Sequence, residues 1–109
     1  MINDILILSN LTRGMEAKLR RIAFGWRQID LASLAKVGNI EVTLLEKDRF
    51  VLPIKLNYML YWLEMPLYVH SSANLERVTE YVMAKFGNEK EIYWKQREEA
   101  CKRHLQPGF

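Results

Sequence analysis

Apolar residues in the first half of the chain recur at steps of three and four, the period of an amphipathic helix. The first such pattern covers residues 12–24, where Thr12 is a candidate N-cap and Gly25 a candidate left-handed residue after the last turn. Its expected inward stripe consists of Leu11, Met15, Leu19, Ile22, Ala23 and Trp26. The pattern predicts a helix that buries this stripe.

Three shorter helices are expected next, over residues 28–36, over residues 39–47 and from Pro53 onward. Val37 and Gly38 form the short turn between the first two. The expected inward residues are, in chain order, Leu31, Ala32 and Ala35, then Val42 and Leu45, then Leu56, Met59, Leu60 and Leu63. Residues 12–65 are therefore predicted to form a helical bundle, preceded by an N-terminal extension of residues 1–11.

Residues 66–109 form a predicted C-terminal extension. Pro66 interrupts the helical pattern, and residues 67–70 have an extended character that could pair with residues 5–8 in a short two-stranded β element. Two helices should follow, one after Ser72 that ends at Gly87 and one from Asn88 to Leu105. The apolar face of the first consists of Leu75, Val78, Val82 and Phe86. The two helices either pack on the bundle or pair with a second copy of the chain, and the sequence leaves both alternatives open.

Composition limits the possible functions. Half of the 109 residues are apolar, which is enough for one domain with an appendage, and the net charge of +3 permits contact with a polyanion. Cys101 is the only cysteine, so no intrachain disulfide can form, and with His70 and His104 it provides too few ligands for structural zinc. The apolar run 5–8 is too short to cross a bilayer. A soluble cytoplasmic protein without a metal or cofactor is expected.

An enzyme is not expected, because the chain has no glycine-rich phosphate loop and no acidic residue near either histidine in sequence. Cys101 is interpreted as a packing residue of a helix. The more informative pattern is the spacing of seven residues across the second and third helices: Gln28, Leu31, Ala32, Val37, Val42, Leu45 and Glu46.

This spacing resembles that of the lambda-repressor-like, Cro/Xre-type helix-turn-helix family. Arg21, seven residues before Gln28, and the pair Gly25 and Trp26 extend the resemblance, which covers about residues 12–63. It implies a mainly all-α fold: a four- to five-helix bundle with a helix-turn-helix and the C-terminal helical extension. It also implies a structural ion pair between Arg21 and Glu46, and a repressor-like regulator that binds double-stranded DNA as a dimer.

The resemblance places the DNA contacts on the second and third helices. Gln28 would hold a phosphate, although an exposed helix-start residue is an equal interpretation. The flanking basic residues Arg27, Lys47 and Arg49 would neutralise phosphates. On the third helix the outward residues that would meet the bases or the backbone are Asn39, Ile40, Glu41 and Thr43.

Some residues depart from the family pattern. Lys36 stands where a small residue is usual, Gly38 where a Ser or Thr caps the third helix, and Asp48 where glycine is common. Ile40 and Leu44 form an apolar stripe on the face that would read DNA. The alternative is therefore a protein-interaction module on the same scaffold, with Ile40 and Leu44 as anchors for a protein partner.

Overall fold

The computed structural model describes residues 11–70 and 74–105, with side chains up to Lys102. These residues form five α-helices and no β-strand: α2 (Arg13–Ala23), α3 (Gln28–Ala35), α4 (Asn39–Glu46), α5 (Pro53–Trp62) and α6 (Leu75–Leu105). The chain divides into two compact units, residues 1–70 and residues 71–109. The prediction of a mainly all-α protein is confirmed.

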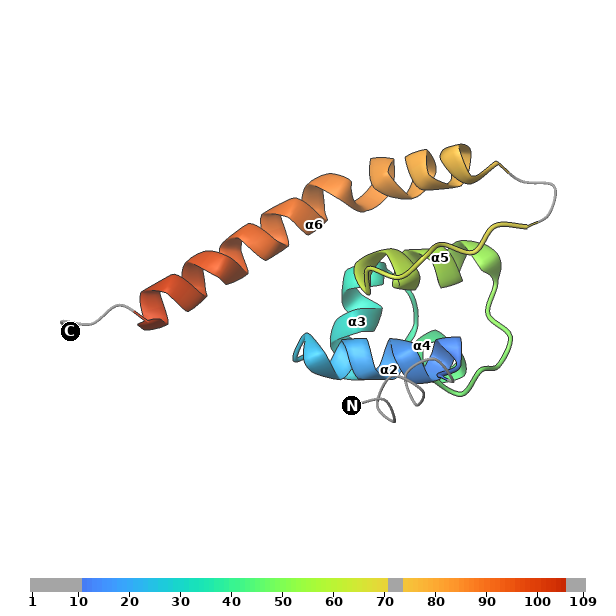
Figure 1. Ribbon diagram of the computed structural model, residues 1–109, viewed down its shortest axis with the longest axis horizontal. Helices are drawn as coiled ribbons and strands as arrows, with labels where there is room; N and C mark the ends of the chain where they lie inside the picture. Colours follow the sequence, from blue (N-terminus) through green and yellow to red (C-terminus); the bar gives the residue numbers. More distant parts are fainter. Residues whose placement is uncertain (1–10, 71–73, 106–109) are drawn as a thin grey trace, which may run out of the picture. The chain divides into compact units, whose positions relative to one another are not determined.

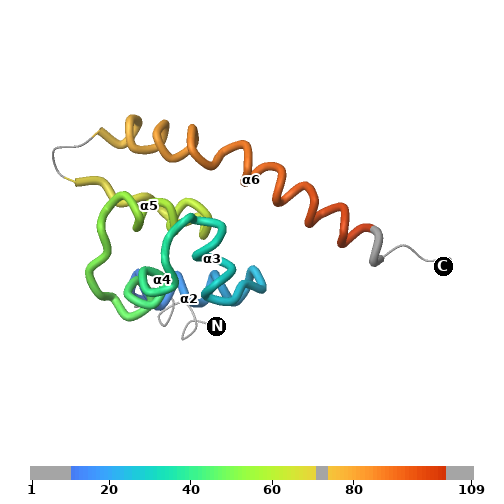
Figure 2. The backbone as a smooth tube through the Cα atoms, turned by 180° about the vertical axis from the view of Figure 1, so that it is seen from behind, coloured from blue at the N-terminus to red at the C-terminus, as the bar shows by residue number. Residues whose placement is uncertain are grey.

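The four short helices form the first unit, with α2 and α4 side by side and α3 reaching from α4 to α5 (Figure 1). The view from behind shows the same arrangement, and α4 packs against each of the other three (Figure 2). All of the predicted inward residues of α3, α4 and α5 are buried, which confirms their periodic pattern. The largest fully buried side chains of this unit are Trp62, Leu31, Met59, Leu60, Leu63 and Val42.

The predicted inward face of α2 is wrong for most of its residues, although Trp26, just beyond the helix, is buried as expected. Met15, Leu19 and Ile22 are 48%, 51% and 55% exposed, and the buried residues of the helix are Gly14, Ala17 and Arg21. The physical reason is the close approach of α2 to the end of α4. A Cβ atom on Gly14 would overlap the carbonyl oxygen of Leu45. Small residues and one arginine therefore form the contact, and the larger apolar residues lie on the outer side.

The ends of α2 are as predicted. Thr12 is the N-cap, and its hydroxyl accepts a hydrogen bond of 3.2 Å from the backbone N–H of Met15. Gly25, just after the helix, has a φ of 79°, the left-handed conformation that glycine adopts without a steric penalty. The chain can therefore turn sharply into α3.

The segment after α5 runs back along that helix in an irregular conformation (Figure 1). The side chain of Asn57, which is 6% exposed, takes the place of a pairing strand: its amide donates to the carbonyl of Tyr68 at 2.8 Å, and its oxygen accepts from the N–H of Tyr68 at 2.6 Å. No strand forms over the described residues 67–70. The other half of the predicted β element, residues 5–8, lies outside the described residues.

The second unit contains one helix where two were predicted. The 31 residues of α6 run without a break through Gly87 and Asn88. Gly87 has no positive φ, and a helix-interior glycine costs only about 1 kcal/mol relative to alanine, less than the hydrogen bonds lost by ending the helix there. The predicted cap Ser72 lies outside the described residues. Val82 and Phe86 of the predicted apolar face are buried, whereas Leu75 is 56% exposed.

Candidate nucleic-acid interface

A three-residue connection, Lys36 to Gly38, joins α3 to α4. Lys36 ends α3 in the left-handed conformation with a φ of 56°, and Gly38 is the N-cap of α4. Because the connection is this short, the two helices must turn sharply against each other, and side chains from both meet at their packed faces. Polar contacts then fix the angle between them.

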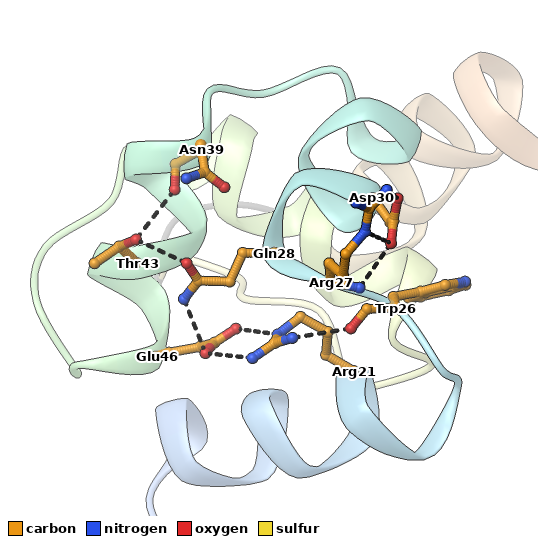
Figure 3. Close-up of polar contacts among 8 residues, drawn as sticks. All are labelled: Arg21, Trp26, Arg27, Gln28, Asp30, Asn39, Thr43 and Glu46. Carbon is orange, nitrogen blue, oxygen red and sulfur yellow. Dashed lines mark hydrogen bonds and ion pairs between the residues drawn. The ribbon is translucent and has the colours of Figure 1, made fainter.

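An ion pair between Arg21 of α2 and Glu46, the last residue of α4, joins the two helices (Figure 3). Nε of Arg21 donates to one carboxylate oxygen at 2.6 Å, Nη2 donates to the other at 3.1 Å, and Nη1 donates to the carbonyl of Trp26 at 2.9 Å. The two side chains are only 11% and 5% exposed. The structure thus forms the ion pair expected from the resemblance, as a bidentate bond that specifies geometry as well as charge.

Gln28 extends this network across to α4 (Figure 3). Its amide nitrogen donates to Oε1 of Glu46 at 3.2 Å, and its amide oxygen accepts from the hydroxyl of Thr43 at 3.4 Å. The same hydroxyl lies 3.3 Å from the carbonyl of Asn39. The half-buried side chain of Gln28 thus bridges α3 and α4, and its expected role in holding a phosphate stays a prediction.

Glu41 is turned back over the start of α4 and is held by α5. Its carboxylate accepts from Nζ of Lys55 at 2.9 Å, and this bond lowers the pKa of Glu41, with backbone N–H groups of Glu41 and Gly38 adding to the effect. A Cβ atom on Gly38 would overlap this carboxylate. The glycine that departs from the family pattern therefore makes room for Glu41, whose charge at the helix N-terminus replaces a capping side chain.

The outward surface of α4 begins with Asn39, which is exposed, and Ile40, which is 66% exposed. Thr43 and Leu44 are half-buried, so the expected apolar stripe of Ile40 and Leu44 is narrower than the spacing indicated. The start of α4 thus presents the amide of Asn39, which can donate and accept hydrogen bonds, beside the aliphatic side chain of Ile40.

Basic side chains flank this surface unequally. Lys47 and Arg49 are exposed after α4, and neither makes an ion pair within residues 11–70 and 74–102. Arg27, at the start of α3, is already paired with Asp30 at 3.1 Å, and this contact lowers the pKa of Asp30. Within the described residues, two of the three predicted phosphate-binding cations are therefore without an ion-pair partner.

Asp48 is a positioning residue that sequence reasoning missed. It has a φ of 57°, and its two carboxylate oxygens accept from the hydroxyl of Thr12 at 2.6 Å and from the N–H of Gly14 at 2.9 Å. These bonds, that of Thr12 first, lower the pKa of Asp48. The carboxylate thereby ties the end of α4 to the start of α2, which explains an aspartate where glycine would suit the backbone. The small residues Gly14 and Ala17, three positions apart, could have indicated from the sequence that another helix approaches this face of α2 closely.

Comparisons with protein-family models, with curated proteins and with solved structures found no significant match. Within the part of the chain that the structure describes, no group of three or more His, Cys, Asp or Glu residues is placed to hold a metal ion. None of the helices described combines the length and apolar character that crossing a membrane requires.

Proposed function

We propose that the protein is a sequence-specific DNA-binding regulator with a lambda-repressor-like helix-turn-helix, in which α3 and α4 form the motif and α4 reads the major groove. The observation that carries the proposal is that α4 is fixed from three sides while its N-terminal outward residues stay uncovered. Arg21, Gln28 and Lys55 hold it through Glu46, Thr43 and Glu41. Asn39 and Ile40 remain exposed.

The dimensions and chemistry of α4 suit a base-reading helix. Its eight residues span about 12 Å, similar to the width of the major groove of B-DNA. The amide of Asn39 matches the N6 and N7 edge of adenine, and the side chain of Ile40 matches the methyl group of thymine. A site rich in A·T pairs is therefore the expected target.

The electrostatics of the surface also support the proposal. Glu41 would repel phosphates if its charge faced outward, but it is paired with Lys55 and its side chain is 17% exposed. Lys47 and Arg49 provide cations beside the reading helix that make no ion pair with any described residue. Arg27 contributes less, because it would have to leave Asp30 to bind a phosphate. Gln28 acts by positioning α4, and the backbone N–H groups at the start of α3 take the role of phosphate donors.

We also propose that the protein acts as a dimer. One eight-residue helix reads only a few base pairs, whereas two copies placed one helical turn of DNA apart double the contact with a two-fold site. Light scattering of the full chain at binding concentrations should then give twice the chain mass of 12.9 kDa. A mass of one chain that persists on a two-fold duplex would contradict the dimer.

Selection from a pool of random duplexes tests the reading helix. We expect enrichment of a short motif that binds at least about 10³-fold more tightly than mixed DNA. Asn39→Ala should weaken binding to the selected duplex by about 1 to 3 kcal/mol and relax the preference for adenine at one position. Lys18→Ala, an exposed cation on α2, is the matched control and should leave the preference unchanged. Failure to enrich any motif would contradict the proposal.

The second candidate function is a protein-interaction module, which is favoured by the 66% exposure of Ile40. The variant Ile40→Ser, Leu44→Ser separates the two. If α4 anchors a protein partner, the variant loses a copurifying protein and keeps any affinity for DNA. If α4 reads DNA, the variant loses affinity for the selected duplex.

A further inference from the structure

A cavity of about 220 Å³ lies in the first unit, beside the C-terminal end of α4. Its walls come from the start of α2, the connection after α4, the start of α5 and Tyr68. The apolar residues that line it are Leu45, Phe50, Val51, Pro53, Leu56 and Tyr68. This cavity lies outside the α3–α4 contacts described above and has no role in the proposed reading of DNA bases.

The apolar lining is graded from deep to exposed. Leu45, Val51 and Leu56 are 3%, 7% and 7% exposed, whereas Phe50 is 76% exposed. The inner part is thus a largely aliphatic surface, and the opening carries a phenyl ring with most of its area in water. An aromatic ligand would cover this ring, and aromatic pairs contribute beyond the area they bury.

The charged residues that line the cavity, Arg13, Arg49 and Asp48, leave one net positive charge. Arg13 and Arg49 both line it, with the guanidinium of Arg13 5.5 Å from the centre of the Tyr68 ring. The single lining carboxylate, that of Asp48, accepts hydrogen bonds from Thr12 and Gly14, and its charge attracts Arg13, so the charge left over is that of Arg49. Arg49 has no ion pair within the described part of the chain. The complementary ligand therefore carries a negative charge.

Size sets the remaining limit on the ligand. A cavity of about 150 Å³ lined by aliphatic and aromatic side chains holds one benzene molecule. The present cavity, at about 220 Å³, has room for one ring with a short charged substituent. A dinucleotide or a lipid could place only part of itself within this volume.

We propose that this cavity binds a small organic anion with an apolar body, typified by an aromatic carboxylate. The ring packs between Leu56 and Phe50, and the carboxylate accepts hydrogen bonds from Arg49 and Arg13. The site shares Arg49 with the proposed DNA-binding surface, but it requires neither Asn39 nor the exposed part of α4, on which base reading depends.

Titration of the ¹⁵N-labelled full chain with benzoate, followed by amide chemical shifts, tests the site. We expect saturable shifts confined to residues 48–51 and to residues near Leu56 and Tyr68, with a dissociation constant of about 1 mM for so small a ligand. Neutral benzyl alcohol should bind at least about tenfold more weakly than benzoate, since it lacks the charge that the arginines recognise. Equal affinity for the alcohol would overturn the claim that charge selects the ligand.

Two variants distinguish the cavity from general attraction of anions to a basic surface. Arg49→Gln should weaken benzoate binding about tenfold, the loss expected for one charge-assisted hydrogen bond. Lys47→Gln removes an exposed charge two residues away that does not line the cavity, and should change binding by less than about twofold. Equal effects of the two variants, or shifts scattered over the basic surface, would overturn the proposal.

Inorganic phosphate is the last probe, because a DNA phosphate could use the same arginines. If the apolar lining contributes to binding, phosphate binds more weakly than benzoate and does not shift residues near Leu56. Phosphate that binds as tightly as benzoate, with the same shifts, would reduce the cavity to an anion site and overturn the apolar part of the proposal. Loss of DNA binding in Asn39→Ala leaves all of these outcomes unaffected, so the two proposals fail separately.

Discussion

Glu46→Ala is predicted to destabilise the bundle strongly, although Glu46 is not part of its apolar core. Glu46 accepts two bonds from Arg21 and one from Gln28. Its loss leaves the guanidinium of Arg21, 11% exposed, with one remaining bond, to the carbonyl of Trp26. A buried charge deprived of its partner costs about 3 to 5 kcal/mol, a large fraction of the stability of a small domain.

Urea unfolding followed by far-ultraviolet circular dichroism measures this loss. The matched control is Lys47→Ala, at the adjacent exposed position, which should change the free energy of unfolding by less than about 0.5 kcal/mol. Arg21→Met combined with Glu46→Leu should recover most of the lost stability, because an apolar pair of similar volume leaves no unpaired charge. A loss below about 1 kcal/mol for Glu46→Ala, with an unchanged slope, would refute the reasoning.

Three further changes test the local packing. Gly14→Ala should lower the free energy of unfolding by about 1 to 3 kcal/mol in urea, since the new Cβ would meet the backbone carbonyl of Leu45; a neutral result would mean that α2 can move away from α4. Lys36→Gly should raise it by about 0.5 to 1 kcal/mol, because glycine adopts the φ of 56° without strain, and a thermal melt that shows no gain would contradict that conformation. Asp48 has a pKa below its ordinary value of 3.8, so the stability that it contributes is complete above pH 3.8 and is lost as the pH falls through the lower folded-state pKa. Asp48→Asn should remove this part of the acid dependence of the free energy of unfolding. An identical acid profile in the variant would count against the bonds to Thr12 and Gly14.

The sequence predicted the helices of the first unit well because their apolar residues point inward with a regular period. Leu31, Val42 and Leu60 are buried as expected, and Thr12 and Gly25 stand at the ends of α2 as expected. These features depend on interactions between near neighbours in sequence, which propensity and periodicity describe.

The face of α2 could not be predicted in the same way. Residues with a helical spacing lie on two faces of α2, and hydrophobicity alone favours burial of the face that carries Met15 and Leu19. The choice of the other side depends on how closely α4 can approach Gly14, which is a tertiary effect. The prediction of a helix end at Gly87 was wrong because glycine permits a helix end but does not require one.

Within the candidate site, the pairing of Arg21 with Glu46 could be anticipated from the resemblance, but the partners of Glu41 and Gln28 could not. Lys55 reaches Glu41 from a different helix, and Gln28 meets Thr43 only because α3 and α4 turn sharply against each other. Such contacts depend on the angle between helices, which the spacing of apolar residues does not specify.

The central claim, that α4 and its flanking cations face DNA, is tested most directly by fluorescence anisotropy with a mixed-sequence duplex between about 50 and 200 mM salt. The proposal predicts binding with a steep dependence on salt, with each phosphate contact adding about 0.9 to the slope of the log–log plot. Lys47→Ala should lower that slope by about 0.9, whereas Lys18→Ala should leave it unchanged. No binding at the lowest salt, or equal slopes for the wild-type chain and Lys47→Ala, would contradict a DNA-binding surface around α4.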